Sequence, residues 1–313
     1  MVDLTKISHL WKKHEKADLD GLVPSFSELT EIKRYVPYLK NFEFNQSSNK
    51  SGDFKSSFKG RGMEFEEVRS YTYGDDVRDI DWRVTARKNQ PYTKLYTEEK
   101  DREVYIWLDL SSKMRFGTKN ELKSVTAAKT ASLLGWFALA TRDRLGLMIY
   151  DGNKTHIFKP QRDYENLLIL LKKIEQISRN CLNETQENQN IIKSLQLSSK
   201  RIGRKSIVFV ISSFDFPNDD IKREISALSF NNDVYLLNIY DALEDIAPPK
   251  GEYLAQYQSK NQLLISSGKN FEQNYQAYFV NKRLLLKDFC IKFNCKYRQI
   301  RTDLPIYKQL RPL

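Results

Sequence analysis

The sequence has 313 residues, of which 40% are hydrophobic and 29% charged, a composition typical of a folded globular protein rather than a disordered or fibrous one. No apolar run approaches the roughly 20 residues that a membrane-spanning helix needs, and the first residues lack the apolar core of a signal peptide, so we expect a cytoplasmic protein with no transmembrane segment. The formal net charge is +11, and the three cysteines match no redox or zinc spacing.

The excess positive charge lies in the later two-thirds of the chain. Residues 1–100 hold 18 Lys and Arg against 17 Asp and Glu, whereas the remainder holds 33 against 23. The densest basic run, Lys200, Arg201, Arg204 and Lys205, directly precedes an expected strand. Such a surplus favours nucleic acid or an anionic surface as a partner. No aromatic platform accompanies these residues, however, and a solvated surface explains them as well.

The first hundred residues divide into two segments. Residues 1–50 are expected to form a helical segment, because Leu29, Ile32 and Val36 recur at helical spacing after serines that can cap a helix. Residues 51–100 are expected to form an accessory segment, which begins in a Ser-, Gly- and Lys-rich stretch and ends in a strand-like run, YTKLYTEE (residues 92–99). At its centre, GDDVRDIDWRVTARK (residues 74–88) crowds four aspartates and four basic residues around one tryptophan.

This charged centre admits two interpretations. Unpaired carboxylates so close together would raise one another's pKa values, so the mixed charges indicate caps and ion pairs in one short helix. These would brace the accessory segment against the next domain, with Trp82 adding buried area. The same arginine-rich surface could instead dock a partner. The residues concerned in either case are Arg69, Asp76, Arg78, Asp81, Trp82 and Arg87.

From residue 101 to residue 313, strand-like and helix-like runs alternate. The expected strands are 103–110, 144–152, 205–213, 234–241 and 297–301, and the expected helices are 123–140, 164–177, 220–229 and 271–293. This alternation predicts an α/β fold with a doubly wound, mostly parallel sheet, whose function gathers at the carboxyl ends of the strands. No glycine-rich loop follows the first strand, which argues against a nucleotide-binding enzyme.

The first of these strands ends in LDLSSKMRFG (residues 108–117), which resembles the DxSxS metal-ion-dependent adhesion site of von Willebrand factor A domains. Together with GRGMEFEEVRSYTYGDDVRDIDWRVTAR (residues 60–87) and DRLGLMIYDG (residues 143–152), it resembles the bacterial domain of unknown function 58 family over roughly residues 55–265. The resemblance implies a von Willebrand factor A-like fold for residues 101–313. It also implies a partner, a MoxR-type AAA+ ATPase, in chaperone-like maturation of a client protein or in a stress response.

The adhesion-site motif is degenerate at the positions that would bind the metal. Asp109 and Ser111 match its first two ligands, but the third position is Lys113, whose ammonium group would repel a divalent cation. The strand-end aspartate of the family pattern is Ser213 here, with Asp215 two residues later. We therefore expect no cofactor, since Lys113 disfavours Mg²⁺. Either Lys113 takes the place of the metal beside Asp109, or it points into solvent.

A second acidic loop, DALEDIAPP (residues 241–249), follows a later strand, and Asp241 and Glu244 in it are most simply caps and turn formers. No nucleophile paired with a base, and no pair of catalytic carboxylates, emerges from the sequence. We therefore expect a non-enzymatic protein-interaction module that binds a MoxR-type ATPase or its client. The alternative is a nucleic-acid or anionic-surface binding protein that uses its basic face. The oligomeric state stays open.

Overall fold

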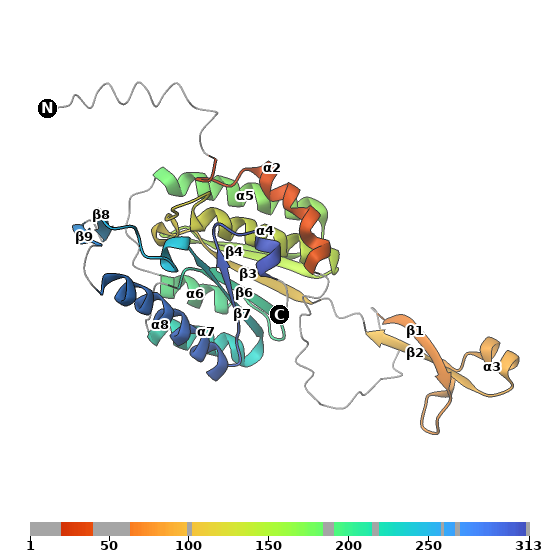
Figure 1. The fold of residues 1–313 in the computed structure, drawn as a ribbon. Helices are drawn as coiled ribbons and strands as arrows, with labels where there is room; N and C mark the ends of the chain where they lie inside the picture. Colours follow the sequence, from red (N-terminus) through yellow and green to blue (C-terminus); the bar gives the residue numbers. More distant parts are fainter. Residues whose placement is uncertain are drawn as a thin grey trace. The chain divides into compact units, whose positions relative to one another are not determined.

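The computed structural model describes residues 20–39, 63–98, 102–183, 191–214, 219–257, 260–266 and 270–310. The chain divides into two units: a larger one of residues 1–44 and 102–313, and a smaller one of residues 45–101. The N-terminal helices, which we expected to form a segment of their own, belong to the larger unit (Figure 1).

Six strands form the sheet of the larger unit, in the spatial order β10-β7-β6-β3-β4-β5. Their bounds are β3 (Glu103–Asp109), β4 (Arg144–Tyr150), β5 (Thr155–Gln161), β6 (Ile207–Ser212), β7 (Asp233–Tyr240) and β10 (Lys296–Arg301). Neighbouring strands are parallel except for β4 with β5. The central strands are almost continuously apolar because helices cover both faces of the sheet. The predicted doubly wound, mostly parallel α/β fold is confirmed.

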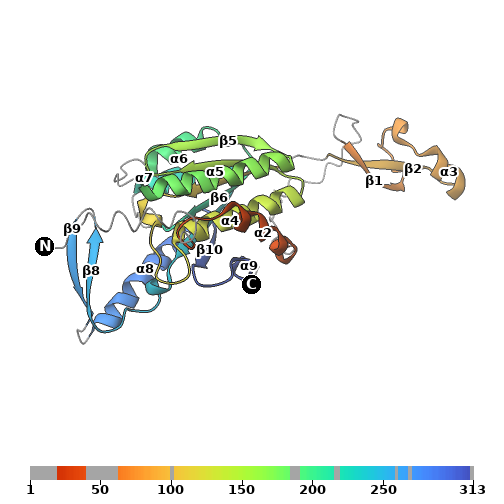
Figure 2. The same ribbon diagram turned by 90° about the horizontal axis from the view of Figure 1, so that it is seen from above.

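Two groups of helices cover the two faces of the sheet, each with its own apolar core (Figures 1 and 2). One face carries α2 (Phe26–Glu31), η1 (Ile32–Leu39), α4 (Lys123–Ala140), α5 (Tyr164–Asn183) and α9 (Ile306–Gln309). The other carries α6 (Ile191–Ser199), α7 (Asp219–Asn231) and α8 (Phe271–Lys292). All the strands and helices expected after residue 101 are present, whereas β5 and α6 were not predicted.

The N-terminal helices are held in the core by backbone as well as apolar contacts. Of the two serines that could cap α2, Ser25 and Ser27, it is Ser25 that does so, in a capping box with Glu28. The carbonyl oxygen of Leu29, a fully buried residue, accepts hydrogen bonds from the Ser132 hydroxyl and from Trp136 Nε1 on α4. These bonds satisfy a carbonyl that would otherwise be buried without a partner, so α2 and α4 fold as one layer.

The smaller unit is an antiparallel pair, β1 (Met63–Ser70) and β2 (Tyr92–Glu98), with two short helices between the strands. We expected one short helix here. The chain instead forms the 3₁₀ turn η2 (Val77–Asp79) and then α3 (Trp82–Lys88). Asp76 caps the first and Asp81 caps the second, because each carboxylate accepts a hydrogen bond from a backbone N–H at the start of its helix.

The remaining elements of the larger unit follow the strand ends. The 3₁₀ turn η3 (Ser112–Met114) follows β3, and η4 (Ala242–Glu244) follows β7. A hairpin of β8 (Glu252–Tyr257) and β9 (Lys260–Ile265) precedes α8. Among the residues that the structure describes, no helix has the length and apolar character needed to span a bilayer.

Candidate functional site

The candidate site is the edge of the sheet at which the parallel strands end. The loop after β3 begins with Leu110 and contains η3. Ser212 ends β6 and is followed by Ser213, and β7 is followed by Asp241 and η4. Because β3, β6 and β7 are parallel neighbours in the sheet, their carboxyl ends lie together, as the winding of the fold predicts.

Asp109, the first position of the degenerate adhesion motif, is buried beneath this edge, with 1% of its surface exposed. Its Oδ1 accepts a hydrogen bond from the backbone N of Ser111 (2.9 Å), and its Oδ2 accepts one from the Ser212 hydroxyl (2.6 Å). Burial raises the pKa of Asp109, although both hydrogen bonds act in the opposite direction. The carboxyl group is thus satisfied by the protein itself.

Lys113 does not replace a metal beside this carboxylate. Its side chain is exposed, and within the described residues it forms no ion pair with Asp109. Its charge is only a minor influence that lowers the pKa of Asp109. Of the two alternatives for Lys113, the structure therefore supports exposure to solvent. Ser213 is buried, and Asp215 lies outside the described residues.

The described residues at this edge offer few free carboxylate donors to a divalent cation. Within the described parts of the chain, no three His, Cys, Asp or Glu side chains gather closely enough to hold a metal ion. Asp109 is the one carboxylate of the motif among them, and both its oxygens are already engaged by Ser111 and Ser212. Mg²⁺ and Ca²⁺ prefer several oxygen ligands that include free carboxylates.

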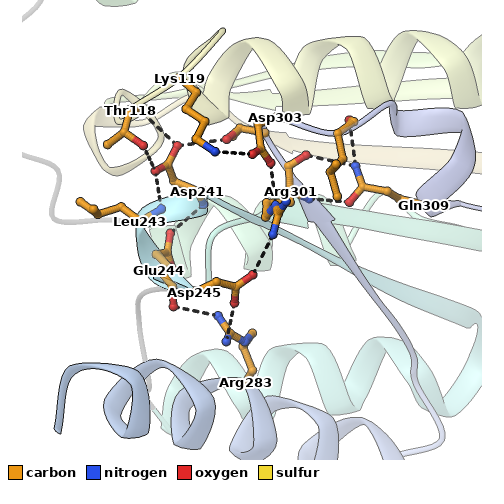
Figure 3. Close-up of polar contacts among 12 residues, drawn as sticks. Thr118, Lys119, Asp241, Leu243, Glu244, Asp245, Arg283, Arg301, Asp303 and Gln309 are labelled. Carbon is orange, nitrogen blue, oxygen red and sulfur yellow. Dashed lines mark hydrogen bonds and ion pairs between the residues drawn. The ribbon is translucent and has the colours of Figure 1, made fainter. Parts of the chain in front are cut away.

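The loop after β7 is the centre of a second polar cluster (Figure 3). Asp241 is completely buried, and its carboxylate accepts hydrogen bonds from the backbone N and the hydroxyl of Thr118, from Leu243 N and from the Thr302 hydroxyl. Burial acts to raise the pKa of Asp241, but these donors hold it below its usual value. Glu244 closes a capping box, so the interpretation of Asp241 and Glu244 as caps is confirmed.

Ion pairs extend this cluster across three further elements. Asp245 pairs with Arg283 of α8 (2.8 Å) and with Arg301 of β10 (3.4 Å), and Arg301 in turn pairs with Asp303 (2.6 Å) (Figure 3). Lys119, in the loop before α4, also pairs with Asp303 (3.0 Å). The loops after β3, β7 and β10 and the helix α8 are therefore fastened to one another.

Sequence reasoning missed most of this cluster. Thr118, Arg283, Arg301, Thr302 and Asp303 carry no motif, and they are brought to Asp241 and Asp245 only by the fold. One signal was present in the sequence: the polar run Arg301, Thr302 and Asp303 lies directly at the end of an expected strand, at the same edge as Asp241.

In the smaller unit, the charged centre forms caps and ion pairs. Arg69 pairs with Asp75 (2.7 Å) and Lys94 pairs with Asp81 (3.7 Å), while Asp76 and Asp81 serve as helix caps. The capping aspartates thus agree with the first part of the brace interpretation. Trp82, which we expected to add buried area, has 66% of its surface exposed. Two further residues of the charged centre, Arg78 and Arg87, are also exposed.

Several solved structures are similar to this chain at low sequence identity. The conserved hypothetical protein BatB from Bacteroides thetaiotaomicron is 13% identical with a TM-score of 0.40, and the match covers 66% of this chain and 93% of that chain. An aerotolerance-related membrane protein from Bacteroides fragilis is 15% identical with a TM-score of 0.40, covering 67% and 98%. The SpRpn10 VWA domain is 13% identical with a TM-score of 0.33, covering 67% and 93%.

Sequence relatives and a family model give a more specific result. Uncharacterized proteins of Mycobacterium bovis and Mycobacterium tuberculosis are 25% identical over 205 residues, which is 66% of this chain and 63% of theirs. The chain thus matches less than two thirds of the length of these relatives. The family described as "Protein of unknown function DUF58" matches residues 67–283, from β1 into α8. This match spans well over half of the sequence and confirms the resemblance seen in its motifs, so the chain belongs to the DUF58 family.

Proposed function

We propose that the chain is a non-enzymatic protein-interaction module that binds a MoxR-type AAA+ ATPase through the carboxyl edge of its sheet. The observation that carries this proposal is that the buried carboxylates at that edge already have hydrogen-bond or ion-pair partners within the chain. Asp109 and Asp241 are engaged by internal donors, and Glu244 forms a buried ion pair with Lys123. A general acid or base must reach its substrate, which these groups cannot do.

These internal hydrogen bonds and ion pairs also suit a binding surface. Loops that are fastened by hydrogen bonds and ion pairs lose little further conformational freedom on association, so more of the contact energy appears as affinity. Lys113 and Phe116 extend from this fixed edge, and Phe116 has 41% of its surface exposed. The type of partner follows from the resemblance to the family, in which a MoxR-type ATPase and a client protein are implied.

The proposal is tested by association with a MoxR-type ATPase from the same organism, followed by size-exclusion chromatography with and without ATP. We expect ATP-dependent comigration, and we expect the double variant Lys113→Glu and Phe116→Ala to abolish it. Lys159→Glu, an equally conspicuous charge reversal on the edge strand β5, is the control and should comigrate like the wild type. Failure of the chain to associate with any such ATPase would sink the proposal.

The alternative, binding of nucleic acid, predicts a different edge of the molecule. Lys200, Arg201, Arg204 and Lys205 lie between α6 and the start of β6, at the amino end of that strand. Scattered cations of this kind act chiefly by counterion release, so we expect weak binding that disappears towards physiological salt. Fluorescence anisotropy with labelled duplex and single strands measures it. Sub-micromolar affinity at about 150 mM salt would favour the alternative over the ATPase.

A further inference from the structure

The helix α8 exposes far more apolar surface than a surface helix normally does. Of its 22 residues, only Phe289 and Cys290 are buried. Its exposed large apolar side chains are Tyr278, Val280, Leu284, Leu285 and Ile291. A helix at the surface of a globular protein usually confines such residues to the face that it buries, and a cluster of exposed ones marks an interaction site. Figure 2 shows α8 extending away from the sheet towards the β8–β9 hairpin.

A groove of about 1240 Å³ lies beside this helix, between α8, α7 and the loop that contains η3. Its walls are largely apolar: Phe279, Leu286 and Phe289 line it from α8, and Ile221 and Ile225 line it from α7. The groove therefore opens next to the strand-end edge, but it is formed mainly by the helices on one face of the sheet.

The residues of α8 that line the groove follow the spacing of a helix-packing surface. They are Tyr275, Tyr278, Phe279, Asn281, Lys282, Leu285, Leu286, Asp288, Phe289 and Lys292. Steps of three and four residues place them in one continuous stripe along the helix, the arrangement that receives the side chains of a second helix. From Tyr275 to Lys292 the stripe is about 26 Å long at 1.5 Å per residue, which matches a partner helix of about five turns.

The rim of the groove is positively charged. Lys113, Lys123, Lys222, Arg223, Lys282 and Lys292 line it, against Asp219, Glu244 and Asp288. Lys222 and Arg223 pair with exposed aspartates in the first turn of α7, contacts that water screens strongly. Within the described residues, neither Lys113 nor Lys292 forms an ion pair. This charge complements an acidic partner, and it disfavours a second copy of α8, which carries the same positive excess.

We propose that this groove binds an amphipathic α-helix of a partner protein, one whose apolar stripe is flanked by acidic residues. The apolar stripe of the partner helix would pack on α8 and α7, while the acidic residues beside the stripe would face Lys113 and Lys292 at the rim. This proposal makes the proposed function more specific, because it names the kind of segment that the chain binds. It rests on the proposed function only for the assumption that the chain acts by binding a protein.

The test is a titration of the full chain with two helix-stapled peptides of about 18 residues. Both carry the same leucine and phenylalanine stripe; one has glutamates at the flanking positions and the other has lysines. We expect the acidic peptide to bind in the micromolar range and the basic peptide to bind at least about tenfold more weakly. Because no ATPase takes part, this experiment and the comigration experiment can fail independently.

Two variants on one helix locate the site. Leu285 and Ile291 are both 70% exposed on α8, but only Leu285 lines the groove. Leu285→Glu should weaken binding of the acidic peptide at least about tenfold, whereas Ile291→Glu should change it less than about twofold. Equal binding of both peptides, an equal effect of both variants, or no binding up to about 100 µM would each overturn the proposal. Two further results would overturn the proposal if the peptide does not bind. One is concentration-dependent dimerisation that Leu285→Glu abolishes, and the other is binding to phosphatidylglycerol vesicles that Leu285→Glu abolishes.

Discussion

The helices α4 and α8 both carry apolar residues on all sides, but their environments are opposite. Every residue of α4 is buried except Lys129, Leu139 and Ala140, whereas α8 buries only Phe289 and Cys290. Neither helix has a single apolar face with a polar face opposite. A helix of this kind needs neighbours on every side, and α4 has them in the sheet, α2, η1 and α5.

The difference shows that neighbours, rather than the helix sequence, decide whether apolar residues become core or surface. The cover of α4 includes segments far away in the chain: Leu29 accepts hydrogen bonds from Ser132 and Trp136 across more than 100 residues. The helix α8 is supported by contacts with β10 and by the ion pair of Arg283 with Asp245. Its remaining apolar residues are exposed or only partly buried.

The largest expected difference is between Trp136 on α4 and Leu285 on α8. Trp136→Ala removes a fully buried aromatic ring and its hydrogen bond to Leu29, so we expect the free energy of unfolding to fall by about 3–5 kcal/mol. Leu285→Ala, at a side chain that is mostly exposed, should change it by less than about 0.5 kcal/mol. Urea denaturation followed by circular dichroism measures both values. A comparable loss for the two variants would show that α8 is covered in solution.

The next largest effect on stability is expected at Glu244, whose carboxylate contacts one lysine from each of the two helices. Glu244 forms a buried ion pair with Lys123 of α4, and Lys282 of α8 lies 3.9 Å from its other oxygen. Lys123→Met would leave the buried carboxylate without its main partner, at a cost of about 3 kcal/mol. Lys282→Met breaks the longer of the two contacts with Glu244, made by a more exposed side chain, so its cost should be below about 1 kcal/mol.

The measurement is again the free energy of unfolding, with the double variant Lys123→Met and Glu244→Gln added. Because the double variant removes the buried charge together with its partner, it should recover part of the lost stability. Equal losses for Lys123→Met and Lys282→Met would mean that Glu244 is not held chiefly by α4.

Most of the sheet and its covering helices could be predicted from the sequence, because buried parallel strands are unbroken apolar runs and helices fill the intervals. The strand β5 could not, since its side chains are only partly buried and Pro160 interrupts its pattern. The sequence predicts a helix over residues 271–293, but it does not reveal that the apolar residues of α8 lie all round the helix. Its exposed surface depends on which elements fail to cover it, and a single sequence does not contain that information.

The candidate site was predictable in place but only partly in chemistry. The motif located Asp109 and Ser111 at a strand end, and Lys113 indicated that the metal motif is altered. The actual partner of Asp109 is Ser212, which lies 103 residues away, and Asp241 is held by Thr118 at a separation of 123 residues. Hydrogen bonds between such distant residues follow from the strand order of the sheet, and local patterns do not reveal them.

Burial also affects the charge state of Asp109 at the carboxyl edge of the sheet. Its pKa is raised by burial, so the folded state disfavours the ionised form. The stability that the neutral form contributes is fully present below the unfolded pKa and is lost as pH rises through the folded pKa. Asp109→Asn mimics the neutral form. At about pH 8 we expect the variant to be more stable than the wild type by on the order of 1 kcal/mol, with the gap closing towards about pH 4.

Asp241→Asn is the matched control, because Asp241 is equally buried at the same edge but has a lowered pKa. The sign is reversed there: its contribution is present above the unfolded pKa and is lost as pH falls through the folded pKa. Asp241→Asn should therefore be less stable than the wild type at neutral pH. Thermal melts across the pH range measure both variants, and a parallel response of the two would contradict the assignment of Asp109.

The smallest expected effect is that of metal ions on the wild-type chain. Both oxygens of Asp109 are occupied by Ser111 and Ser212, and Lys113 adds a positive charge to the exposed side of the loop. An ion that does not bind the native state cannot raise its thermal midpoint, so millimolar Mg²⁺ or Mn²⁺ should leave the midpoint unchanged. The double variant Lys113→Ser and Ser213→Asp restores two ligands of the adhesion motif, and its midpoint should rise with Mg²⁺. Stoichiometric Mg²⁺ binding to the wild type in calorimetry, lost in Asp109→Ala, would show that the motif still binds metal. In that case the hydrogen bonds of Asp109 must give way to the ion, and the open position of Lys113 would be what leaves room for it.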